Sequence, residues 1–303
     1  MSSPKITKVA IAGASGSIGT PITKALLDAG FTVTALTRPE STSSFPSGVH
    51  VARVDYTDSS SLKSALAGQD ALISTLTTQA VGAQSTLMQA AVAAGVYRII
   101  PSEFGSDTLN ARARTLAVFK DKVTIQDLVT CLCAESGGRT TYTLVLNNAF
   151  LDWGVEKNFL IDVKGKSYEL LDGGENYFTS TPLSFVAAGV VAILQRPEET
   201  ANRAVRLQGA RMTQKQLLAI VQRIVGSEGW TVTKAESQQV GADALAALKA
   251  DSSNVPGWLF PMLKLAIHKE EFGGDFGGRH DNEMLDLKEL DEREVEEMIR
   301  GVL

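Results

Sequence analysis

A glycine-rich segment at the start of the chain, Val9 to Gly19 (Val-Ala-Ile-Ala-Gly-Ala-Ser-Gly-Ser-Ile-Gly), constrains the fold most. An apolar run that predicts a strand leads straight into Gly13, Gly16 and Gly19, and then into a helical pattern. In a dinucleotide site, such glycines permit a tight turn, a close backbone approach to the pyrophosphate and close packing of the helix on the sheet. The phosphates then lie at the positive N-terminus of the helix. The segment predicts a dinucleotide-binding turn, with a plain glycine-rich βα turn as the alternative.

The next predicted strand, Phe31 to Arg38, ends where a βαβ unit places the residue that reads the adenosine ribose. An Asp or Glu there would bind the free 2′-hydroxyl and repel a phosphate, whereas Arg38 can hold a 2′-phosphate in a bidentate contact. We therefore expect NADPH/NADP⁺ rather than NAD. A solvated arginine at a strand end is the alternative.

Composition excludes several classes of partner. The 303 residues are 44% hydrophobic, enough for one large or two modest domains, and the net charge of −5 comes without a lysine or arginine run. Nucleic acids and anionic membranes attract a concentrated basic surface, so we expect neither as a partner. No secretory signal and no apolar run near the length of a membrane span stand out, which predicts a cytoplasmic protein. The three histidines show no ligand spacing, so we expect no metal site.

Short apolar runs alternate with helical patterns through the first half of the chain. Such alternation is typical of a parallel sheet, and it predicts an α/β fold with a doubly wound Rossmann domain over residues 1–150. The expected strands are 9–12, 32–36, 50–54, 71–76, 98–101 and 142–146, and the expected helices are 21–29, 61–67, 83–94 and 119–134.

Beyond Phe150 the pattern changes to a smaller, mixed α/β substrate-binding region, which we assign to residues 151–303. The stretches 164–174 and 255–261, rich in glycine, proline or aromatic residues, predict irregular structure. One segment, 181–208, is expected to return to the Rossmann sheet as a helix and a strand. The last residues, 287–303, predict an acidic helix with a solvated face.

The residue expected to move protons is Lys122. Ordinary short-chain dehydrogenases use a Tyr-x-x-x-Lys pair, and none of the five tyrosines is followed by lysine four positions later. Lys122 begins an apolar stripe with Ile125 and Val129, so it should point inward, whereas Lys120 lies about 200° around the helix on the water side. A partly desolvated lysine has a lowered pKa and can give or take a proton. The alternative is a lysine whose stem covers apolar surface while its amine reaches water.

The order of several motifs resembles the NmrA-like, isoflavone reductase-like family of atypical short-chain dehydrogenases. The resemblance is carried by Gly-Ala-Ser-Gly-x-Ile-Gly, by Arg38, by a helix from Gln84 that ends in Ala-Ala-Gly-Val-Tyr-Arg, and by Ile-Ile-Pro-Ser-Glu-Phe-Gly at residues 99–105. The last string is most typical of the isoflavone, pinoresinol–lariciresinol and phenylcoumaran benzylic ether reductase branch. We expect a fungal or microbial member.

The resemblance implies roles for individual residues. The branch has a Phe-x-x-Lys motif with a catalytic lysine, which Phe119 and Lys122 match, and an Asn-x-Phe motif, which Asn148 and Phe150 match. The plant enzymes usually continue the lysine helix with two arginines, where this chain has Thr124 and Ile125, so its substrate is expected to differ. The expected cofactor contacts are Gly13, Ser15, Gly16, Ser17, Ile18, Gly19, Arg38, Thr75, Ser102, Phe104, Lys122, Asn148 and Phe150, and the expected substrate contacts are Phe104, Trp153, Trp258 and Phe260.

Two functions follow from these patterns. The first is an NADPH-dependent reductase that transfers hydride to an aromatic or enone-type metabolite of secondary metabolism, with Lys122 as general acid or base. The second is an NmrA-like regulator that binds NAD(P) and a protein partner without turnover. The retained lysine and Asn-x-Phe motifs favour the enzyme. The substrate and the oligomeric state stay open, with a homodimer as the assembly to consider.

Overall fold

The computed structural model describes residues 5–77 and 80–303 and divides into two compact units, each built from separated stretches of chain. The first unit contains residues 1–104, 121–146 and 183–205, and the second contains 105–120, 147–182 and 206–303. The stretch 105–120 lies within the predicted domain 1–150 but groups with the second unit in the structure.

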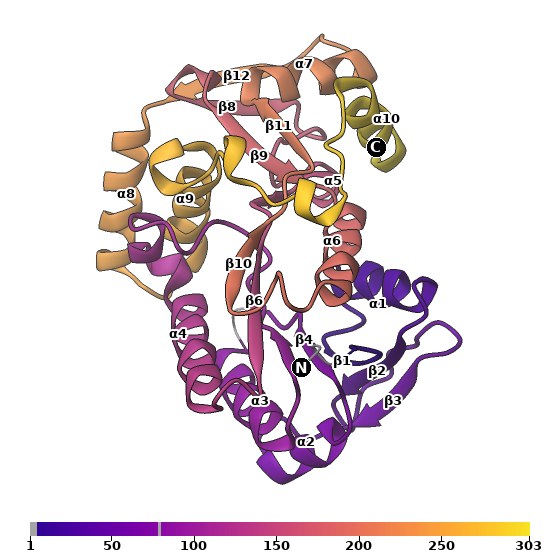
Figure 1. Cartoon of the computed structure of the whole chain (residues 1–303). Coiled ribbons are helices and arrows are strands. Elements are labelled where there is room, and N and C mark those ends of the chain that lie inside the picture. Colours follow the sequence, from indigo (N-terminus) through magenta and orange to yellow (C-terminus); the bar gives the residue numbers. More distant parts are fainter. Residues whose placement is uncertain (1–4, 78–79) are drawn as a thin grey trace. The chain divides into compact units, whose positions relative to one another are not determined.

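The first unit is a Rossmann-like α/β structure, as predicted, with a sheet of seven strands in the order β10-β6-β5-β4-β1-β2-β3 (Figure 1). Every pair of neighbouring strands in the run β6-β5-β4-β1-β2-β3 of this sheet is parallel. The late segment 181–208 contains α6 and β10, and β10 is the edge strand of this sheet beside β6. The elements are β1 (Lys8–Ala12), α1 (Gly19–Asp28), β2 (Thr32–Thr37), β3 (His50–Arg53), α2 (Ser59–Leu66), β4 (Ala71–Ser74), α3 (Val81–Ala94), β5 (Arg98–Ile100), α4 (Lys120–Glu135), β6 (Thr141–Leu146), α6 (Leu183–Gln195) and β10 (Arg203–Arg206).

The strand order of this sheet creates a switch point between β1 and β4. From β1 the chain runs to β2 on one side, whereas β4, on the other side of β1, is followed by β5 and β6 farther out. Loops at the carboxyl ends of two such strands diverge and leave a crevice, where ligands of open α/β sheets bind. The first unit therefore places the loop after β1 and the residue after β4, Thr75, at the position expected for a ligand.

A buried arginine joins the outer strands of this sheet. Arg98 of β5 is fully buried, and its guanidinium donates to the hydroxyls of Thr141 (2.9 Å), Thr143 (2.8 Å) and Thr200 (2.8 Å) and to the carbonyl of Pro197. Burial lowers the pKa of Arg98 to about 10, which still leaves it charged at neutral pH. Four oxygen acceptors thus replace water around a buried cation, as burial of a charge requires.

The second unit is a mixed α/β structure that contains two small sheets, with strand orders β11-β9-β7 and β12-β8. One apolar cluster, which includes Leu151, Phe178 and Ile220, packs these elements together. The elements are β7 (Ala149–Phe150), α5 (Leu151–Glu156), β8 (Ser167–Leu171), β9 (Tyr177–Thr181), β11 (Ala210–Thr213), α7 (Gln214–Val225), β12 (Thr231–Ala235), α8 (Ser237–Ala250), α9 (Val255–His268) and α10 (Glu292–Val302), with short 3₁₀ helices η2 (Ala113–Thr115), η3 (Ala117–Phe119), η4 (Asp172–Gly174), η5 (Glu270–Phe272), η6 (Gly277–Arg279) and η7 (Glu283–Leu285).

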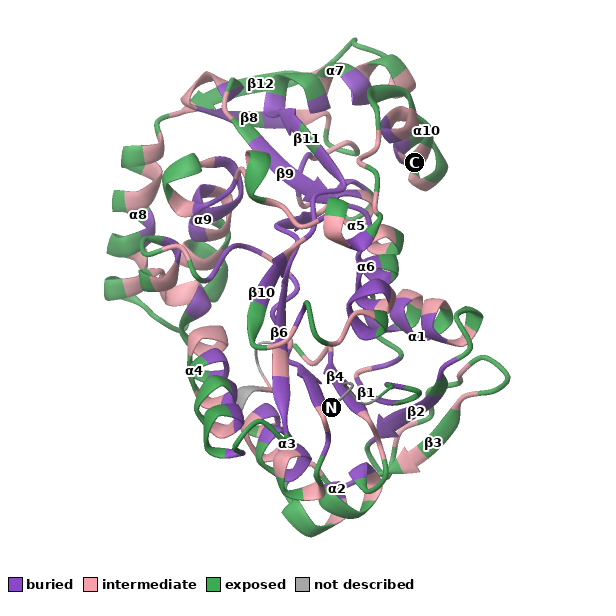
Figure 2. Ribbon diagram, in the orientation of Figure 1, coloured by how far each residue is buried: buried purple, intermediate pink, exposed green. Residues whose placement is uncertain are grey.

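Two predictions for this unit are wrong. The stretch 164–174 contains strand β8, and the stretch 255–261 lies within helix α9. Pro256 stands in the first turn of α9, where a missing N–H costs no intrahelical hydrogen bond, so a proline there does not exclude a helix. The start of α9 is largely exposed, whereas Leu265 to His268 at its end are buried (Figure 2). Among the described residues, no helix is both long and apolar enough to cross a membrane.

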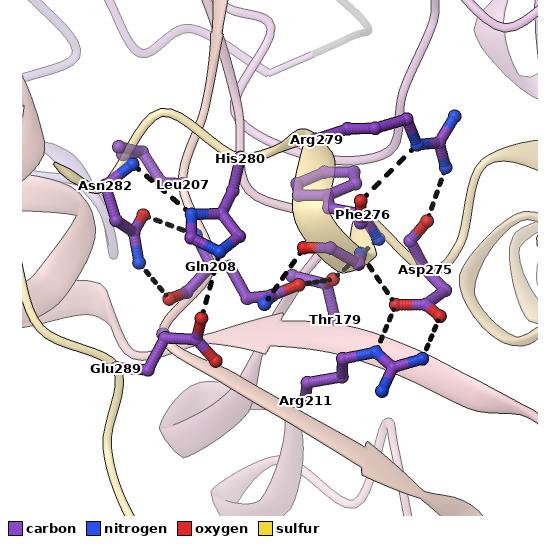
Figure 3. Close-up of polar contacts among 12 residues, drawn as sticks. Thr179, Leu207, Gln208, Arg211, Asp275, Phe276, Arg279, His280, Asn282 and Glu289 are labelled. Atoms are coloured by element: carbon purple, nitrogen blue, oxygen red, sulfur yellow. Dashed lines mark hydrogen bonds and ion pairs between the residues drawn. The ribbon is translucent and has the colours of Figure 1, made fainter. Parts of the chain in front are cut away.

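A network of polar contacts joins β9 and β11 to the loop that follows η5 (Figure 3). Arg211 forms a bidentate pair with Asp275, with distances of 2.9 and 2.8 Å, and stacks over the ring of Tyr177. Asn282 donates to the carbonyl of Gln208 at 2.8 Å and accepts from its backbone N–H at 3.1 Å. These side chains use their polar atoms to hold neighbouring segments, which indicates a structural role.

Candidate active site

The loop after β1 has the backbone geometry that a dinucleotide turn requires. Gly13 has a φ of +83°, in the region that favours glycine, and its carbonyl accepts from the N–H of Gly16 at 2.9 Å. A Cβ on Gly19 would lie 2.1 Å from the oxygen of Gly13, and a Cβ on Gly13 would lie 2.7 Å from Oγ1 of Thr75. Side chains are therefore excluded at both positions, which keeps the backbone open to a ligand.

Thr75, one of the predicted cofactor contacts, holds this loop from the end of β4. Its N–H donates to the carbonyl of Ala12 at 2.8 Å, and its hydroxyl lies 2.9 Å from the carbonyl oxygens of Ala12 and Gly13. No short-range sequence pattern predicts these hydrogen bonds, because β1 and β4 are far apart along the chain and become neighbours only in the sheet. Thr75 positions the first glycine of the turn.

Helix α1 begins at Gly19, which is buried, and carries no acidic residue in its first turn. Ser15, Gly16 and Ser17 are exposed, whereas Ile18 is buried beneath them. Backbone N–H groups at such a helix end, with no carboxylate nearby in the same turn, favour an anion. The residues present fit a pyrophosphate.

Arg38, at the end of β2, is largely exposed: its side chain keeps 73% of its accessible surface and lies 3.3 Å from Glu40. The loop after it is fixed by Arg53, which donates to the carbonyl oxygens of Pro39 at 2.6 Å and Ser41 at 3.2 Å. An exposed guanidinium on an ordered strand end is free to contact a phosphate, although the pair with Glu40 competes for it.

Lys122 lies in the first turn of α4 and is half-buried, whereas Lys120 is exposed. Its ammonium donates to the backbone carbonyl of Glu103, which follows β5. Burial lowers the pKa of Lys122, and the nearby Glu103 charge opposes that shift. The arrangement holds a desolvated amine at the carboxyl end of the sheet, where it can exchange a proton.

The helix that carries Lys122 differs in detail from the prediction. It starts at Lys120 after the 3₁₀ turn η3, and its buried residues are Ile125, Gln126, Val129 and Cys133. Ile125 and Val129, the two residues named in the predicted apolar stripe, are thus both buried, whereas Leu128 and Leu132 are half-buried.

Two other predicted residues of the first unit lie beyond β5. The hydroxyl of Ser102 donates to the carbonyl of Leu76 at 2.8 Å, and its N–H donates to Gln84 at 3.4 Å. Phe104 is 6% exposed and contributes to the core. Ser102 therefore ties the end of β5 to the end of β4, beside the glycine turn.

Asn148 is a centre of hydrogen bonding within the second unit. It has a φ of +52° and is buried, and its Nδ2 lies 2.8 Å from the carbonyl oxygen of Thr179, 3.1 Å from that of Ile267 and 2.8 Å from that of Gly274. Its amide thus fixes β9, the end of α9 and the following loop. Phe150 is half-buried in β7.

A cavity of about 720 Å³ opens in the second unit. Its aromatic side is formed by Trp153, Phe159 and Phe260, whose rings follow one another with centroid separations of 5.7 and 6.3 Å. This size and lining suit a small aromatic molecule. The other lining residues are Lys157, Asn158, Leu160, Ile161, Asp162, Ser167, Tyr168, Glu169, Val240, Asp243, Pro261, Lys264, Ile267 and His268.

Two of the predicted substrate contacts, Trp153 and Phe260, line this cavity, and the sequence analysis did not predict its polar lining residues. Phe260, Lys264 and His268 are spaced by four residues, so they share one face of α9. This spacing is present in the sequence, but it indicates a shared face only in a helix, and the sequence predicts irregular structure at 255–261. Trp258 is not among the described lining residues, and its Nε1 donates to the carbonyl of Ser252 at 3.2 Å.

Comparison with known proteins places this geometry in a family. The model of the NmrA-like family matches residues 5–248. Oxidoreductase poxI of Penicillium oxalicum is 34% identical over 271 residues, which cover 88% of this chain and 84% of that protein. Oxidoreductase aprR of Aspergillus flavus is 31% identical over 301 residues, 98% of each chain.

Solved structures share the fold. A crystal structure of isoflavone reductase, 20% identical, superposes with a TM-score of 0.76 and covers 98% of this chain and all of that one. The complex of leucoanthocyanidin reductase from Vitis vinifera with NADPH, 19% identical, gives a TM-score of 0.76 over 96% of this chain and 99% of that one. The chain therefore belongs to the NmrA-like family, and within it to the oxidoreductases.

Proposed function

We propose that the protein is an NADPH-dependent reductase of an aromatic or enone-type small molecule, with Lys122 as the general acid or base. The observation that carries the proposal is the half-buried ammonium of Lys122, held by the Glu103 carbonyl, with its pKa lowered by burial. Support comes from the relatives, which are oxidoreductases, and from neighbours whose structures contain NADPH or NADP⁺. The relatives favour this reading over a regulator without turnover.

The glycine turn and Arg38 are the proposed cofactor site. The turn has no room for a side chain at Gly13 or Gly19, and its residues 15–17 are exposed just before α1, which suits a pyrophosphate. Arg38 offers a guanidinium where a carboxylate would select NAD. When bound there, NADPH would supply a hydride. The proposed contacts of Asn148 and Phe150 with the cofactor stay predictions, because both residues lie in the second unit.

Lys122 would complete the reaction by moving one proton at the substrate oxygen. A lysine whose pKa is lowered toward the working pH can release and regain its proton readily. The Glu103 carbonyl orients the amine, and the partial burial limits exchange with water. The aromatic cavity of the second unit is the proposed substrate site, which would explain a substrate class of flat, ring-containing molecules.

The test is turnover of NADPH against a panel of aromatic ketones, enones and benzylic ethers. We expect Lys122→Met to fold and bind NADPH but to lose turnover by about 10²–10⁴-fold, the usual contribution of a general acid or base. Lys120→Met, which removes a neighbouring exposed lysine, should change turnover by less than about twofold. Equal losses in the two variants would contradict the role of Lys122.

A further inference from the structure

One of the residues that line the cavity of the second unit is a buried histidine, His268. His268, at the end of α9, is 4% exposed, and its Nδ1 is buried without a hydrogen-bond partner. Its ring packs against the ring of Phe178 in a T-shaped arrangement, with the two centroids 4.5 Å apart. A buried polar group without a partner is costly and commonly marks a place where a ligand or an ordered water completes the bond.

The charge state of this histidine limits what it can bind. Burial, assisted by the positive charge of Lys264, lowers the pKa of His268 to about 3, so the imidazole is neutral near pH 7. A neutral imidazole has one N–H donor and one nitrogen acceptor and carries no charge to attract a carboxylate. The nearest cation on the same helix face, Lys264, is already paired with Glu169. The residue therefore suits an uncharged oxygen.

The backbone beneath His268 is held in place. The carbonyl of Ile267, the preceding residue, accepts from Asn148 at 3.1 Å. Gly274 packs so closely that a Cβ there would lie 2.3 Å from the same carbonyl oxygen. A side chain anchored in this way is preorganised, and a preorganised donor discriminates between ligands because little is lost in ordering it.

We propose that His268 is a specificity-determining residue, which hydrogen-bonds an uncharged carbonyl, ether or hydroxyl oxygen of an aromatic ligand in the cavity lined by Trp153, Phe159 and Phe260. The inference rests on the proposed function in one respect, that this cavity is the substrate site. The aromatic rings select a flat molecule, and His268 selects the position of one oxygen on it. Ligands that differ only in that oxygen should therefore differ in affinity.

The experiment compares trans-chalcone, in which a carbonyl joins a phenyl to a styryl group, with trans-1,3-diphenylpropene, in which a methylene replaces that carbonyl. Binding to the protein without cofactor is measured by quenching of tryptophan fluorescence, since Trp153 lines the cavity. We expect the wild type to bind chalcone about tenfold more tightly than diphenylpropene, as one hydrogen bond that would otherwise be missing implies.

Two substitutions separate the hydrogen bond from packing. His268→Phe keeps a ring against Phe178 but removes both nitrogens, so the affinity for chalcone should fall to that for diphenylpropene, while the affinity for diphenylpropene changes by less than about twofold. His268→Gln keeps a hydrogen-bonding group and should retain a preference for chalcone. His280→Phe, outside the cavity, is the matched control and should leave the preference unchanged.

Four outcomes would overturn the proposal. These are equal binding of the two probes by the wild type, no binding of either probe, an unchanged preference in His268→Phe, and a preference lost in His280→Phe as well. Because these arms contain no NADPH, their failure is distinct from failure of the reductase proposal, which is decided by the turnover of Lys122→Met. A protein that reduces substrates normally but binds both probes equally would refute the role of His268 alone.

Discussion

The glycine turn of the first unit and the cavity of the second unit reach their shapes by different routes. The turn is made of seven consecutive residues, Gly13 to Gly19, and its shape follows from the lack of a side chain at its glycines and from the hydrogen bond between Gly16 and Gly13. The cavity takes its lining from α5, β8, α8 and α9, which are separated by up to about a hundred residues. The first is a local structure, and the second exists only when distant segments are packed.

This difference predicts where substitutions act. A change in the glycine turn should affect cofactor binding most, because the turn is shaped by its own glycines and held from a distance by Thr75. A change in the cavity should affect ligand binding together with the stability of the second unit, because the same residues do both. Asn148 and His268 are examples, since the first holds the helix on which the second stands.

The largest expected effect is that of Gly19→Ala. A Cβ at this position would lie 2.1 Å from the oxygen of Gly13, far inside van der Waals contact, so the turn must move. We expect NADPH to bind at least about a hundredfold more weakly, which corresponds to about 2.7 kcal/mol. Calorimetric titration measures the affinity. Gly301→Ala, at a glycine with open space around it in α10, is the control, and an equal loss there would contradict a local origin.

Next in size is Asn148→Gly, which tests the anchoring of α9. Glycine accepts the φ of +52°, so the substitution isolates the loss of the side-chain amide and its bonds to three carbonyl oxygens. We expect the free energy of unfolding to fall by about 2–3 kcal/mol. Amide hydrogen exchange of residues 267–274 should accelerate at the same time.

The control for that variant is Asn202→Gly, at an exposed asparagine with a φ of +54°. It should change the free energy of unfolding by less than about 0.5 kcal/mol, as most surface substitutions do. If Asn148→Gly also behaved in this way, the hydrogen-bonding centre would have no energetic weight.

Acid should destabilise the wild type through His268. The folded-state pKa of about 3 lies below the value near 6.5 of an unfolded chain, so between these two pH values the unfolded state binds a proton that the folded state does not. Stability therefore falls as pH falls. Between pH 7 and pH 5 this group should cost about 2 kcal/mol, from the linkage relation.

His268→Phe should lack that loss, while Lys264, Glu169 and Asp243 around the cavity remain the same in both proteins. Urea unfolding at pH 7 and pH 5 measures the difference. Parallel loss of stability in the two proteins would show that His268 does not titrate as its burial implies.

The smallest expected effect belongs to Arg38→Ala. The wild type should bind NADPH more tightly than NADH, and the variant should lose about tenfold of that preference, the lower end for a charge-assisted contact because the side chain is exposed. Glu40→Gln should increase the preference, since it frees Arg38 from its pair. Equal affinity of the wild type for both cofactors would refute the reading of this strand end.

The sequence was informative where structure is local. Periodicity predicts the order of strands and helices in the first unit, including the glycine turn and the late helix and strand α6 and β10. Each of these elements has a hydrophobic pattern that is complete within about ten residues. Strand β8 was missed because the glycines of Asp172–Gly174 suggested a loop, although those glycines only end the strand. Helix α9 was not predicted, because prolines such as its Pro256 and Pro261 usually interrupt a helix.

Tertiary contacts account for the rest. Thr75 beside Gly13, and Asn148 beside Ile267, are more than sixty residues apart along the chain, and no short-range pattern pairs them. His268 was set aside because it lacked the spacing of a metal ligand, a test that cannot detect a single donor in a cavity.

The split arrangement of the first unit has a consequence for how the protein is made. During synthesis, β1 to β6 leave the ribosome long before β10, which completes the sheet, and α6, which packs against α1. Until residue 200 has emerged, Arg98 lacks the Thr200 hydroxyl and the Pro197 carbonyl, and until β10 has emerged β6 is an unpaired sheet edge. A chain truncated near residue 180 would keep that unpaired edge, and such edges promote aggregation.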